Sequence, residues 1–563
     1  MRRAIPTRMR WAGAAAGLSL ALVAVASPVV GTAGAASPGA PTATPDSTVP
    51  TRVVFIVLDQ LRPEFIDAFD MENVQALIEG GTHFERAYLG HMASETVISH
   101  NVMTSGQLPK NMGWSDEWFR DVDGVLGPED ARYVTGSMSQ EQFDDLIEHE
   151  GYPKLADYLH AEFPGSTVAT VGSKNYAVYT MSGPGSDIRL TFGGREFDCD
   201  GDTTNDASWR GPVGVGVPSY IEEPECGRYY VDADRALHYG TLDTSPAWMY
   251  PVEGNRDVPG YDDAHLGGDI WITDAAFAIM DNEPDWSGML LTYGGIDKAG
   301  HMWGGLNDVP PFPAGATDPM SHLGHLAQVA DEQVGRVIDK LEADGVLDET
   351  LVVLTTDHGQ LQSENYFGAD GLRRGNFNWY YGSDSDETYL SPQPEIQRLI
   401  DETGNVEMSM QDSAVRTWLV DRSSKAKKEA ADVMATLDGV RASYYLMGDR
   451  YQLRSRVHQS EFAPREWDWF KEHAQEIVNT EAAPYAPDVI GLLADNTSYG
   501  VAGDHGGAQE NVQRIPIVFY GAGVTPGGTP NQPMRSVDIL PTILRELGVD
   551  PTYEMDGIAY RVP

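Results

Sequence analysis

The chain has 563 residues and 41% hydrophobic residues, which is typical of a large globular protein with a sizeable core and excludes wholesale disorder. Its 84 Asp and Glu against 39 Lys and Arg give a formal net charge of −45. Such a surface repels duplex nucleic acid and anionic membranes. The plainest explanation of the acidity is solubility in a salty or harsh exterior. An anionic substrate would need a local positive centre, such as bound cations, to overcome the repulsion.

Residues 1–36 have the layout of a secretory signal peptide, with a basic start, an apolar Ala/Leu/Val stretch and small residues before Ser37. An uncleaved anchor is the alternative, and the two Arg at the start raise twin-arginine export as a possible route. Residues 37–50 are rich in Pro, Thr and Ser and are predicted to be a linker. No later segment has the unbroken apolar run of about 20 residues that a membrane span needs. We therefore expect a secreted protein, extracellular or in the cell envelope, without a stable membrane span after cleavage.

Short β-branched runs bounded by polar or turn residues predict buried parallel strands. They are 52–59, 167–172, 289–297, 351–357 and 516–521. Helical patterns lie between them, including one that starts near residue 72, a long amphipathic one over 322–345, and one that closes the chain. This alternation predicts a doubly wound, mostly parallel α/β sheet with helices on both faces. We expect that core in three parts: 51–190, 266–362 and 501–563.

Two insertions interrupt the alternation. Residues 191–265 are irregular and hold Cys199 and Cys226, which are expected to form one disulfide in an exported chain; two free thiols are the alternative. Within this insertion, "DCDGDTTND" (198–206) spaces its acids like a Ca²⁺ loop but lacks the rest of the EF-hand pattern, which favours a polar turn. The second insertion, 363–500, has patterns of a strand, a helix and a hairpin and is predicted to be a small α+β cap.

Asp and His side chains occur in short polar motifs beside the predicted strand ends, where open α/β sheets bind ligands. Mixed carboxylate and imidazole ligands suit zinc, with Mn²⁺ or Fe as alternatives. Each motif alone is more often a turn or a hydrogen-bonded structural histidine, but the set predicts a metal centre. The candidate ligands are Asp59, Asp297, His301, Asp357, His358 and His505.

These motifs resemble the alkaline phosphatase superfamily, and within it the type I phosphodiesterase/nucleotide pyrophosphatase branch. "VFIVLDQLRPEF" is similar to the first metal strand of that branch, and "TVISHNVMTSGQLPKNMGW" to its nucleophile segment. "DKAGH", "TTDHG" and "GDHGG" resemble its later metal motifs, and "SVDILPTILRELGV" with "MDGIAY" its C-terminal end. The resemblance covers most of residues 51–563 outside the two insertions.

The resemblance implies a phosphoric ester hydrolase with two Zn²⁺ per chain and a small phosphate-ester substrate. One zinc would take Asp297, His301 and His505, and the other Asp59, Asp357, His358 and the Thr96 oxygen. Metal coordination would make the Thr96 hydroxyl a nucleophile near neutral pH, and a phosphothreonine intermediate would follow. The alternative role of Thr96 is a helix N-cap. We expect His100, one helical turn later, to support the helix by hydrogen bonds rather than to bind metal.

The sequence departs from the branch at the phosphate contacts. Gln60 stands where the branch usually has Gly. Glu117, 21 residues after Thr96, stands where the branch commonly has a phosphate-binding Asn, and Asn101 or Asn111 is considered as a replacement. Lys174 resembles the first member of a Lys-x-Arg or Lys-x-Lys pair in relatives acting on monoesters or phosphonoacetate, but Tyr176 replaces the second. A single Lys weakly favours diesters, which carry less charge.

The sequence leaves five functions to compare. A secreted zinc-dependent phosphodiesterase is preferred, and a phosphomonoesterase or phosphonoacetate-hydrolase-like enzyme comes second. A sulfatase is disfavoured because Thr96 is not the modifiable Cys or Ser that sulfatases usually have. A non-catalytic binding protein on the same fold would be marked by lost ligands, and none is lost. A calcium-stabilised interaction module has support only from residues 198–206.

Overall fold

A computed structural model describes residues 49–192, 209–211, 216–222, 268–303, 322–361, 365–366, 380–381, 394–500 and 503–563. The predicted signal peptide, nearly all of the linker, both cysteines and the 198–206 loop lie outside the described residues. In this part of the chain no helix has both the length and the apolar character needed to cross a membrane.

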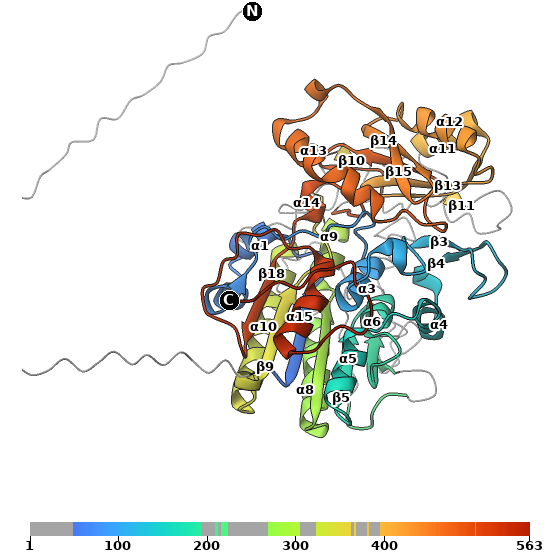
Figure 1. The fold of residues 1–563 in the computed structure, drawn as a ribbon. Helices are drawn as coiled ribbons and strands as arrows, with labels where there is room; N and C mark the ends of the chain where they lie inside the picture. Colours follow the sequence, from blue (N-terminus) through green and yellow to red (C-terminus); the bar gives the residue numbers. More distant parts are fainter. Residues whose placement is uncertain are drawn as a thin grey trace, which may run out of the picture. The chain divides into compact units, whose positions relative to one another are not determined.

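The core is an eight-stranded sheet with helices on both faces (Figure 1), as predicted. The strand order is β2 (Thr82–His83), β18 (Ile517–Gly521), β9 (Thr350–Thr355), β1 (Arg52–Leu58), β8 (Trp286–Tyr293), β5 (Thr167–Gly172), β6 (Ile188–Phe192) and β7 (Trp209–Arg210). The five strands from β9 to β6 are parallel to their neighbours in that run.

Alternate residues of β1 enter opposite cores, which explains its continuous apolar run. Val54, Ile56 and Leu58 pack with one set of helices: α1 (Pro63–Ala68), α2 (Glu72–Gly80), α8 (Asp269–Asn282), α9 (Gly295–Trp303) and α10 (His322–Ala343). Val53, Phe55 and Val57 pack with residues of α3 (Thr96–Ser105), α5 (Leu155–Glu162), α6 (Asn175–Ser182) and α15 (Ile539–Leu547). The sheet is therefore doubly wound.

The prediction that residues 516–521 form a parallel strand is wrong, because β18 runs antiparallel to β9. The chain reaches β18 from the loop that carries His505, at the carboxyl end of β9, and so must run back along it. A buried apolar run has the same sequence pattern in either direction.

A second, antiparallel sheet of six strands lies inside the region predicted as a cap. Its order is β11 (Tyr380–Tyr381), β12 (Val406–Gln411), β13 (Ala414–Leu419), β16 (Val489–Leu493), β14 (Val440–Met447) and β15 (Arg450–Arg456). It carries α11 (Pro394–Thr403), α12 (Ser424–Met434) and α13 (Pro464–Asn479). These elements lie at one end of the core, beside α14 (Glu510–Gln513) and α9 (Figure 1).

Smaller elements complete the described chain. They are α4 (Gln140–Glu150), the hairpin of β3 (Trp118–Asp121) and β4 (Ala131–Val134), the pair of β10 (Asn365–Tyr366) and β17 (Thr497–Ser498), and the 3₁₀ turns Pro109–Asn111, Thr135–Ser137, Leu347–Glu349, Gln459–Glu461 and Ser536–Asp538.

Candidate active site

Polar side chains converge beyond the carboxyl ends of β1 and β9. Asp59 directly follows β1, and Asp357 and His358 follow β9. Thr96 begins α3, and His505 lies in the loop before α14. All five side chains are buried. The structure therefore brings together residues that are up to 446 positions apart in the sequence.

Asp297 does not end a strand, contrary to the prediction. β8 stops at Tyr293, and Asp297 lies in the first turn of α9. His301 lies one turn later on the same helix, as the Asp-x-x-x-His spacing predicts. The backbone of His301 is described, and its side chain lies outside the described part of the structure.

The carboxylates and imidazoles form two overlapping groups whose ligand atoms lie within 4.8 Å of one another: Asp59, Asp357 and His358, and Asp297, His358 and His505. His358 Nε2 is 3.7 Å from Asp59 Oδ1 and 3.5 Å from Asp357 Oδ2. His505 Nε2 is 3.6 Å from Asp297 Oδ1. The two imidazole rings stack with their centroids 3.7 Å apart.

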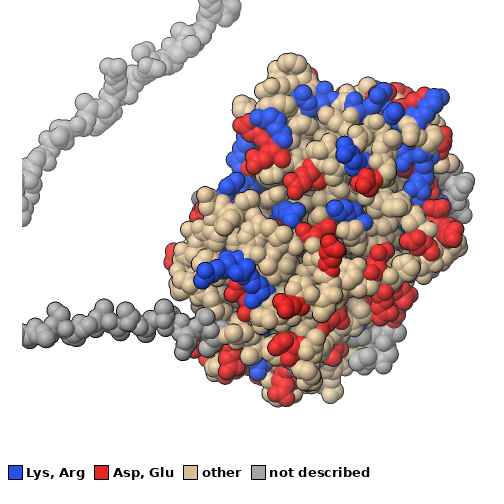
Figure 2. Space-filling view, viewed as in Figure 1, with Lys and Arg blue, Asp and Glu red and all other residues tan. Residues whose placement is uncertain are grey.

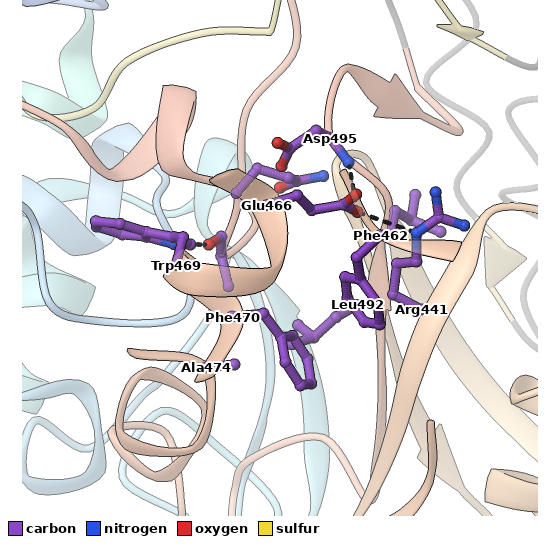
Figure 3. A pocket seen from close by; sticks show the side chains of 11 residues that line it. Arg441, Phe462, Glu466, Trp469, Phe470, Ala474, Leu492 and Asp495 are labelled. Atoms are coloured by element: carbon purple, nitrogen blue, oxygen red, sulfur yellow. Dashed lines mark hydrogen bonds and ion pairs between the residues drawn. The ribbon is translucent and has the colours of Figure 1, made fainter. Parts of the chain in front are cut away.

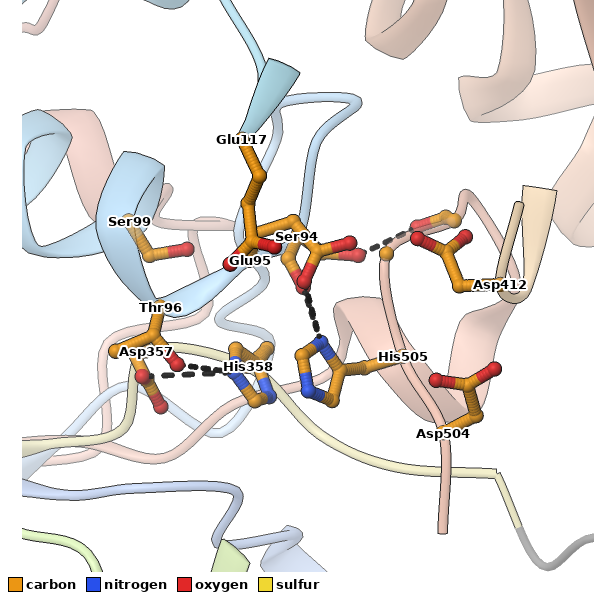
Figure 4. A network of polar contacts seen from close by, with 12 residues as sticks. Ser94, Glu95, Thr96, Ser99, Glu117, Asp357, His358, Asp412, Asp504 and His505 are labelled. Carbon is orange, nitrogen blue, oxygen red and sulfur yellow. Dashed lines mark hydrogen bonds and ion pairs between the residues drawn. The ribbon is translucent and has the colours of Figure 1, made fainter. Parts of the chain in front are cut away.

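Thr96 is the first residue of α3, and the N-cap position belongs to Glu95. Its Oγ1 lies 3.3 Å from His358 Nε2 (Figure 4). The same oxygen lies 3.3 Å from Lys174 Nζ. The Thr96 hydroxyl therefore points into the cluster at the positive end of a ten-residue helix. Thr96 is therefore not the N-cap of α3, which was its alternative role.

Lys174 occupies the N-cap position of α6 and enters the same cluster. Its Nζ lies 2.7 Å from Asp59 Oδ2 and 2.6 Å from Asp297 Oδ2. Lys174 is thus a buried cation between two candidate metal ligands rather than an ordinary surface lysine.

Burial and the closely spaced carboxylates shift the pKa values of the side chains in this cluster. Burial, together with Asp297 and Asp357, raises the pKa of Asp59 well above its ordinary value despite the opposing charge of Lys174. Burial lowers the pKa of His358 to about 3, so this imidazole is a neutral ligand at pH 7. Burial also acts on His505, but Glu95 and Asp297 outweigh it and raise the pKa of that imidazole.

The donor set fits divalent cations. Three carboxylates and two described imidazoles surround one ammonium group, which leaves an excess of buried negative charge. Asp357 Oδ2 is buried and accepts no hydrogen bond from the described residues. Neutral imidazole and carboxylate are the ligand types that zinc takes in catalytic sites.

Gln60, which stands where related sequences usually have Gly, also belongs to the site. Its backbone is left-handed, with φ 69°, which is uncommon for a non-glycine residue and explains why glycine is suited to this position. Its Nε2 donates to Asp297 Oδ1 at 3.0 Å, and its backbone N–H donates to Asp357 Oδ1 at 3.1 Å. Gln60 therefore orients two of the candidate ligands.

His100 has the supporting role that was expected. One ring nitrogen lies 2.8 Å from the Thr96 carbonyl oxygen and the other 2.9 Å from Thr292 Oγ1. Both nitrogens are thus engaged with α3 and β8, and His100 joins α3 to the central sheet.

The two asparagines considered as phosphate contacts are engaged elsewhere. Asn101 Nδ2 donates to Tyr152, and its Oδ1 accepts from Lys154 Nζ at 2.5 Å. Asn111 is exposed, and its Nδ2 donates to Asp556 Oδ2 at 2.8 Å. A single sequence offers no sign of these partners, because each lies 51 or more residues away.

Two glutamates adjoin the cluster. Glu95 Oε2 lies 3.0 Å from His505 Nδ1. The Glu117 side chain extends from just before β3 toward Glu95 (Figure 4). Burial raises the pKa of Glu95 well above its ordinary value, His505 opposes this rise, and the charges of Asp412 and Glu117 add to it. Carboxylates therefore stand on the side of the site where a neutral phosphate contact was expected.

A separate pocket lies within the cap, between α13 and the antiparallel sheet (Figure 3). Phe462, Trp469 and Phe470 form its apolar wall, and Arg441, Glu466 and Asp495 its polar side. None of the cluster residues lines it. The Trp469 indole N–H donates to the Ala508 carbonyl at 2.8 Å, which ties α13 to the loop that carries His505.

Comparisons with known proteins agree with this geometry. Residues 53–513 match the type I phosphodiesterase/nucleotide pyrophosphatase family. Alkaline phosphatase PhoK of Sphingomonas sp. is 23% identical over 551 residues, covering 91% of each chain, and alkaline phosphatase PhoD of Zymomonas mobilis is 22% identical over 525 residues, covering 87% of this chain and 84% of the relative. The crystal structure of alkaline phosphatase PafA superposes with a TM-score of 0.59 at 14% identity, covering 91% of this chain and 98% of that one. The chain therefore belongs to the type I phosphodiesterase/nucleotide pyrophosphatase family, in the alkaline phosphatase superfamily, and is a hydrolase of phosphoric esters.

Proposed function

We propose that the protein is a secreted zinc-dependent phosphodiesterase that acts through a phosphothreonine intermediate on Thr96. The observation that carries the proposal is the buried Thr96 hydroxyl at the start of α3, 3.3 Å from both His358 Nε2 and Lys174 Nζ. A hydroxyl placed among candidate metal ligands and beside one cation has the surroundings of an activated nucleophile.

Two zinc ions are proposed, with Mn²⁺ or Fe as alternatives. Asp59, Asp357, His358 and Thr96 would hold one, and Asp297, His301 and His505 the other. Bound there, the ions would lower the pKa of a coordinated hydroxyl or water and stabilise charge on phosphoryl oxygens. We do not propose a Ca²⁺ site at residues 198–206.

The reaction has two displacements at phosphorus. The Thr96 oxygen attacks, the phosphorus–ester oxygen bond breaks, and the first alcohol leaves with a proton. Water then attacks the phosphothreonine, the phosphorus–Oγ bond breaks, and the proton returns to Thr96. The positive end of α3 and Lys174 lie beside the phosphoryl group throughout and stabilise its negative charge.

The charges near Thr96 favour diesters. Lys174 contributes one positive charge beside Thr96, whereas the carboxylate of Glu95 directly precedes Thr96 in sequence and that of Glu117 extends toward Glu95 (Figure 4). A diester carries one negative charge and a monoester up to two, so these carboxylates repel the monoester more strongly. A phosphomonoesterase or a phosphonoacetate-hydrolase-like enzyme is the second candidate, and the names of PhoK and PhoD as alkaline phosphatases favour the former.

Secretion is proposed from the N-terminal sequence, and the disulfide between Cys199 and Cys226 from the same exported setting. We also propose that the insertion at 191–265 and the cap at 363–500 shape the choice of leaving group.

The test combines metal analysis with hydrolysis of bis-p-nitrophenyl phosphate, p-nitrophenyl phosphate and phosphonoacetate. We expect two equivalents of zinc, the highest kcat/KM on the diester, and a loss of at least 10³-fold in kcat for Thr96→Ala. Thr96→Ser, which retains a hydroxyl, is the matched control and should retain far more activity.

Full turnover by Thr96→Ala, or wild-type protein without stoichiometric metal, would overturn the mechanism. Faster hydrolysis of the monoester than of the diester would keep the mechanism and replace the substrate class.

A further inference from the structure

A buried arginine of the cap reaches into the core beside the metal cluster. Arg416 lies on β13 and is fully buried. Its Nη2 lies 3.0 Å from Glu95 Oε1 and 2.5 Å from Asp412 Oδ2, and its Nε lies 2.6 Å from Asp116 Oδ2. Its Nη1 also donates to the carbonyl oxygen of Gly506.

Three partners of Arg416 adjoin residues of the site in sequence. Glu95 precedes Thr96, Gly506 follows His505, and Asp116 precedes Glu117. One guanidinium group therefore joins three active-site segments to the antiparallel sheet of the cap.

Glu95 extends this chain of contacts to His505. Its Oε1 faces Arg416, and its Oε2 lies 3.0 Å from His505 Nδ1. Gly506 leaves room for this arrangement: its φ is +95°, and a Cβ there would lie 2.2 Å from both Glu95 Oε1 and Asp412 Oδ2.

These contacts decide which nitrogen of His505 carries the proton. Nδ1 faces two acceptors, Glu95 Oε2 and the Ser94 carbonyl oxygen, each at 3.0 Å. A ring nitrogen at hydrogen-bond distance from two acceptors donates to them, so Nδ1 carries hydrogen and, once the ring is neutral, its lone pair lies on Nε2. Nε2 is the nitrogen on the side of Asp297 Oδ1, at 3.6 Å.

We propose that Glu95, held by Arg416, is a positioning residue that orients the His505 ring and directs its Nε2 lone pair toward a bound metal. The inference rests on the proposed zinc enzyme. Carboxylates that accept from a ligating histidine raise its affinity for the metal, and their loss typically weakens binding by 10- to 100-fold. Through Arg416, the cap would then help to hold a metal ligand in place, in addition to its proposed part in the choice of leaving group.

The experiment measures zinc release from the full-length holoenzyme to a chromogenic chelator, alongside kcat and KM with and without added Zn²⁺. Glu95→Gln keeps the size of the side chain but removes its charge. We expect one zinc equivalent to leave at least tenfold faster than from wild type, and kcat to recover when Zn²⁺ is added in excess.

Glu481→Gln is the matched control, because Glu481 is also a fully buried carboxyl near Arg416, and burial and Asp116 raise its pKa despite the charge of Arg416. It should release zinc at the wild-type rate. For Arg416→Met, the control is Arg120→Met: Arg120 is another buried arginine, paired with Glu407 and Asp488. Arg416→Met should accelerate zinc release, whereas Arg120→Met should not.

Zinc release from folded Glu95→Gln within twofold of wild type would overturn the inference while leaving the proposed function intact. If Arg416→Met fails to fold, Glu95→Gln and its control still decide. Wild-type protein that holds no metal and hydrolyses no ester would instead overturn the proposed function itself.

Discussion

His91, five residues before Thr96, shows how a single buried residue makes stability depend on pH. It is fully buried, and burial lowers its pKa from 6.5 to about 4. The unfolded chain therefore takes up a proton at His91 below about pH 6.5. The folded protein does so only near pH 4, so the stabilising effect is present above pH 6.5 and is lost as the pH falls toward 4.

We expect His91→Gln to flatten the acid side of the stability curve. A shift from 6.5 to about 4 corresponds to about 3 kcal/mol of free energy of unfolding. Denaturant unfolding at several pH values from 7 to 4 measures the effect. Over this range the free energy of unfolding should fall by about 3 kcal/mol more for wild type than for the variant. His149→Gln, at an exposed histidine of α4, is the control. Parallel curves for wild type and His91→Gln would contradict the prediction.

The sequence predicts some site residues and not others, for a physical reason. Asp59, Asp357 and His358 could be predicted because each follows a buried apolar strand, and parallel strands end at one edge of a sheet. Glu95 could not be assigned a role, because its partner Arg416 lies 321 residues away in a part of the chain without a readable motif. Local patterns predict which edge of the sheet holds the site, whereas partners across the interior depend on tertiary packing.

At the scale of elements, Lys154 sets the relative position of α3 and α6, the helices whose N-termini hold Thr96 and Lys174. It is fully buried, and its Nζ donates to Asn101 Oδ1 at 2.5 Å, to the Asn101 carbonyl at 3.3 Å and to the Thr180 carbonyl at 2.6 Å. One ammonium group thus links the middle of α3 to the last turns of α6.

Lys154→Met should leave these acceptors unsatisfied and cost about 2–4 kcal/mol of stability. We also expect kcat to fall by about tenfold, because small displacements of a nucleophile are costly in rate. Thermal unfolding and steady-state kinetics well below Tm measure the two effects. Lys110→Met is the control, because Lys110 makes only a partly exposed 3.8 Å ion pair with Asp556. A Lys154→Met enzyme with lower Tm and wild-type kcat would show that the residue supports folding alone.

Secondary structure was predicted well where apolar periodicity was long. The helix predicted over 322–345 is α10, His322–Ala343, and Gly345 follows it with φ +72°. The direction of β18 and the helical location of Asp297 were missed, because hydrophobicity alone encodes neither strand direction nor the point where a strand turns into a helix.

At the scale of the whole molecule, acidic and basic side chains are interspersed on the face seen in Figure 2. The chain nevertheless carries a formal net charge of −45. A phosphate ester approaching this protein is repelled until it reaches the local positive groups of the site. Added salt shortens the range of the repulsion from about 30 Å at 0.01 M to about 8 Å at 0.15 M.

We therefore expect kcat/KM to rise several-fold between about 0.01 and 0.15 M NaCl, because screening weakens long-range repulsion more than contacts within the buried site. The rise should be steeper for p-nitrophenyl phosphate than for bis-p-nitrophenyl phosphate, because the monoester carries more negative charge and each charge feels the same field. Each substrate serves as the control for the other, since direct effects of salt on the enzyme alter both rates together. If kcat/KM fell with salt for both esters, attraction by the site would outweigh the net charge, and the acidic surface would have no part in substrate approach.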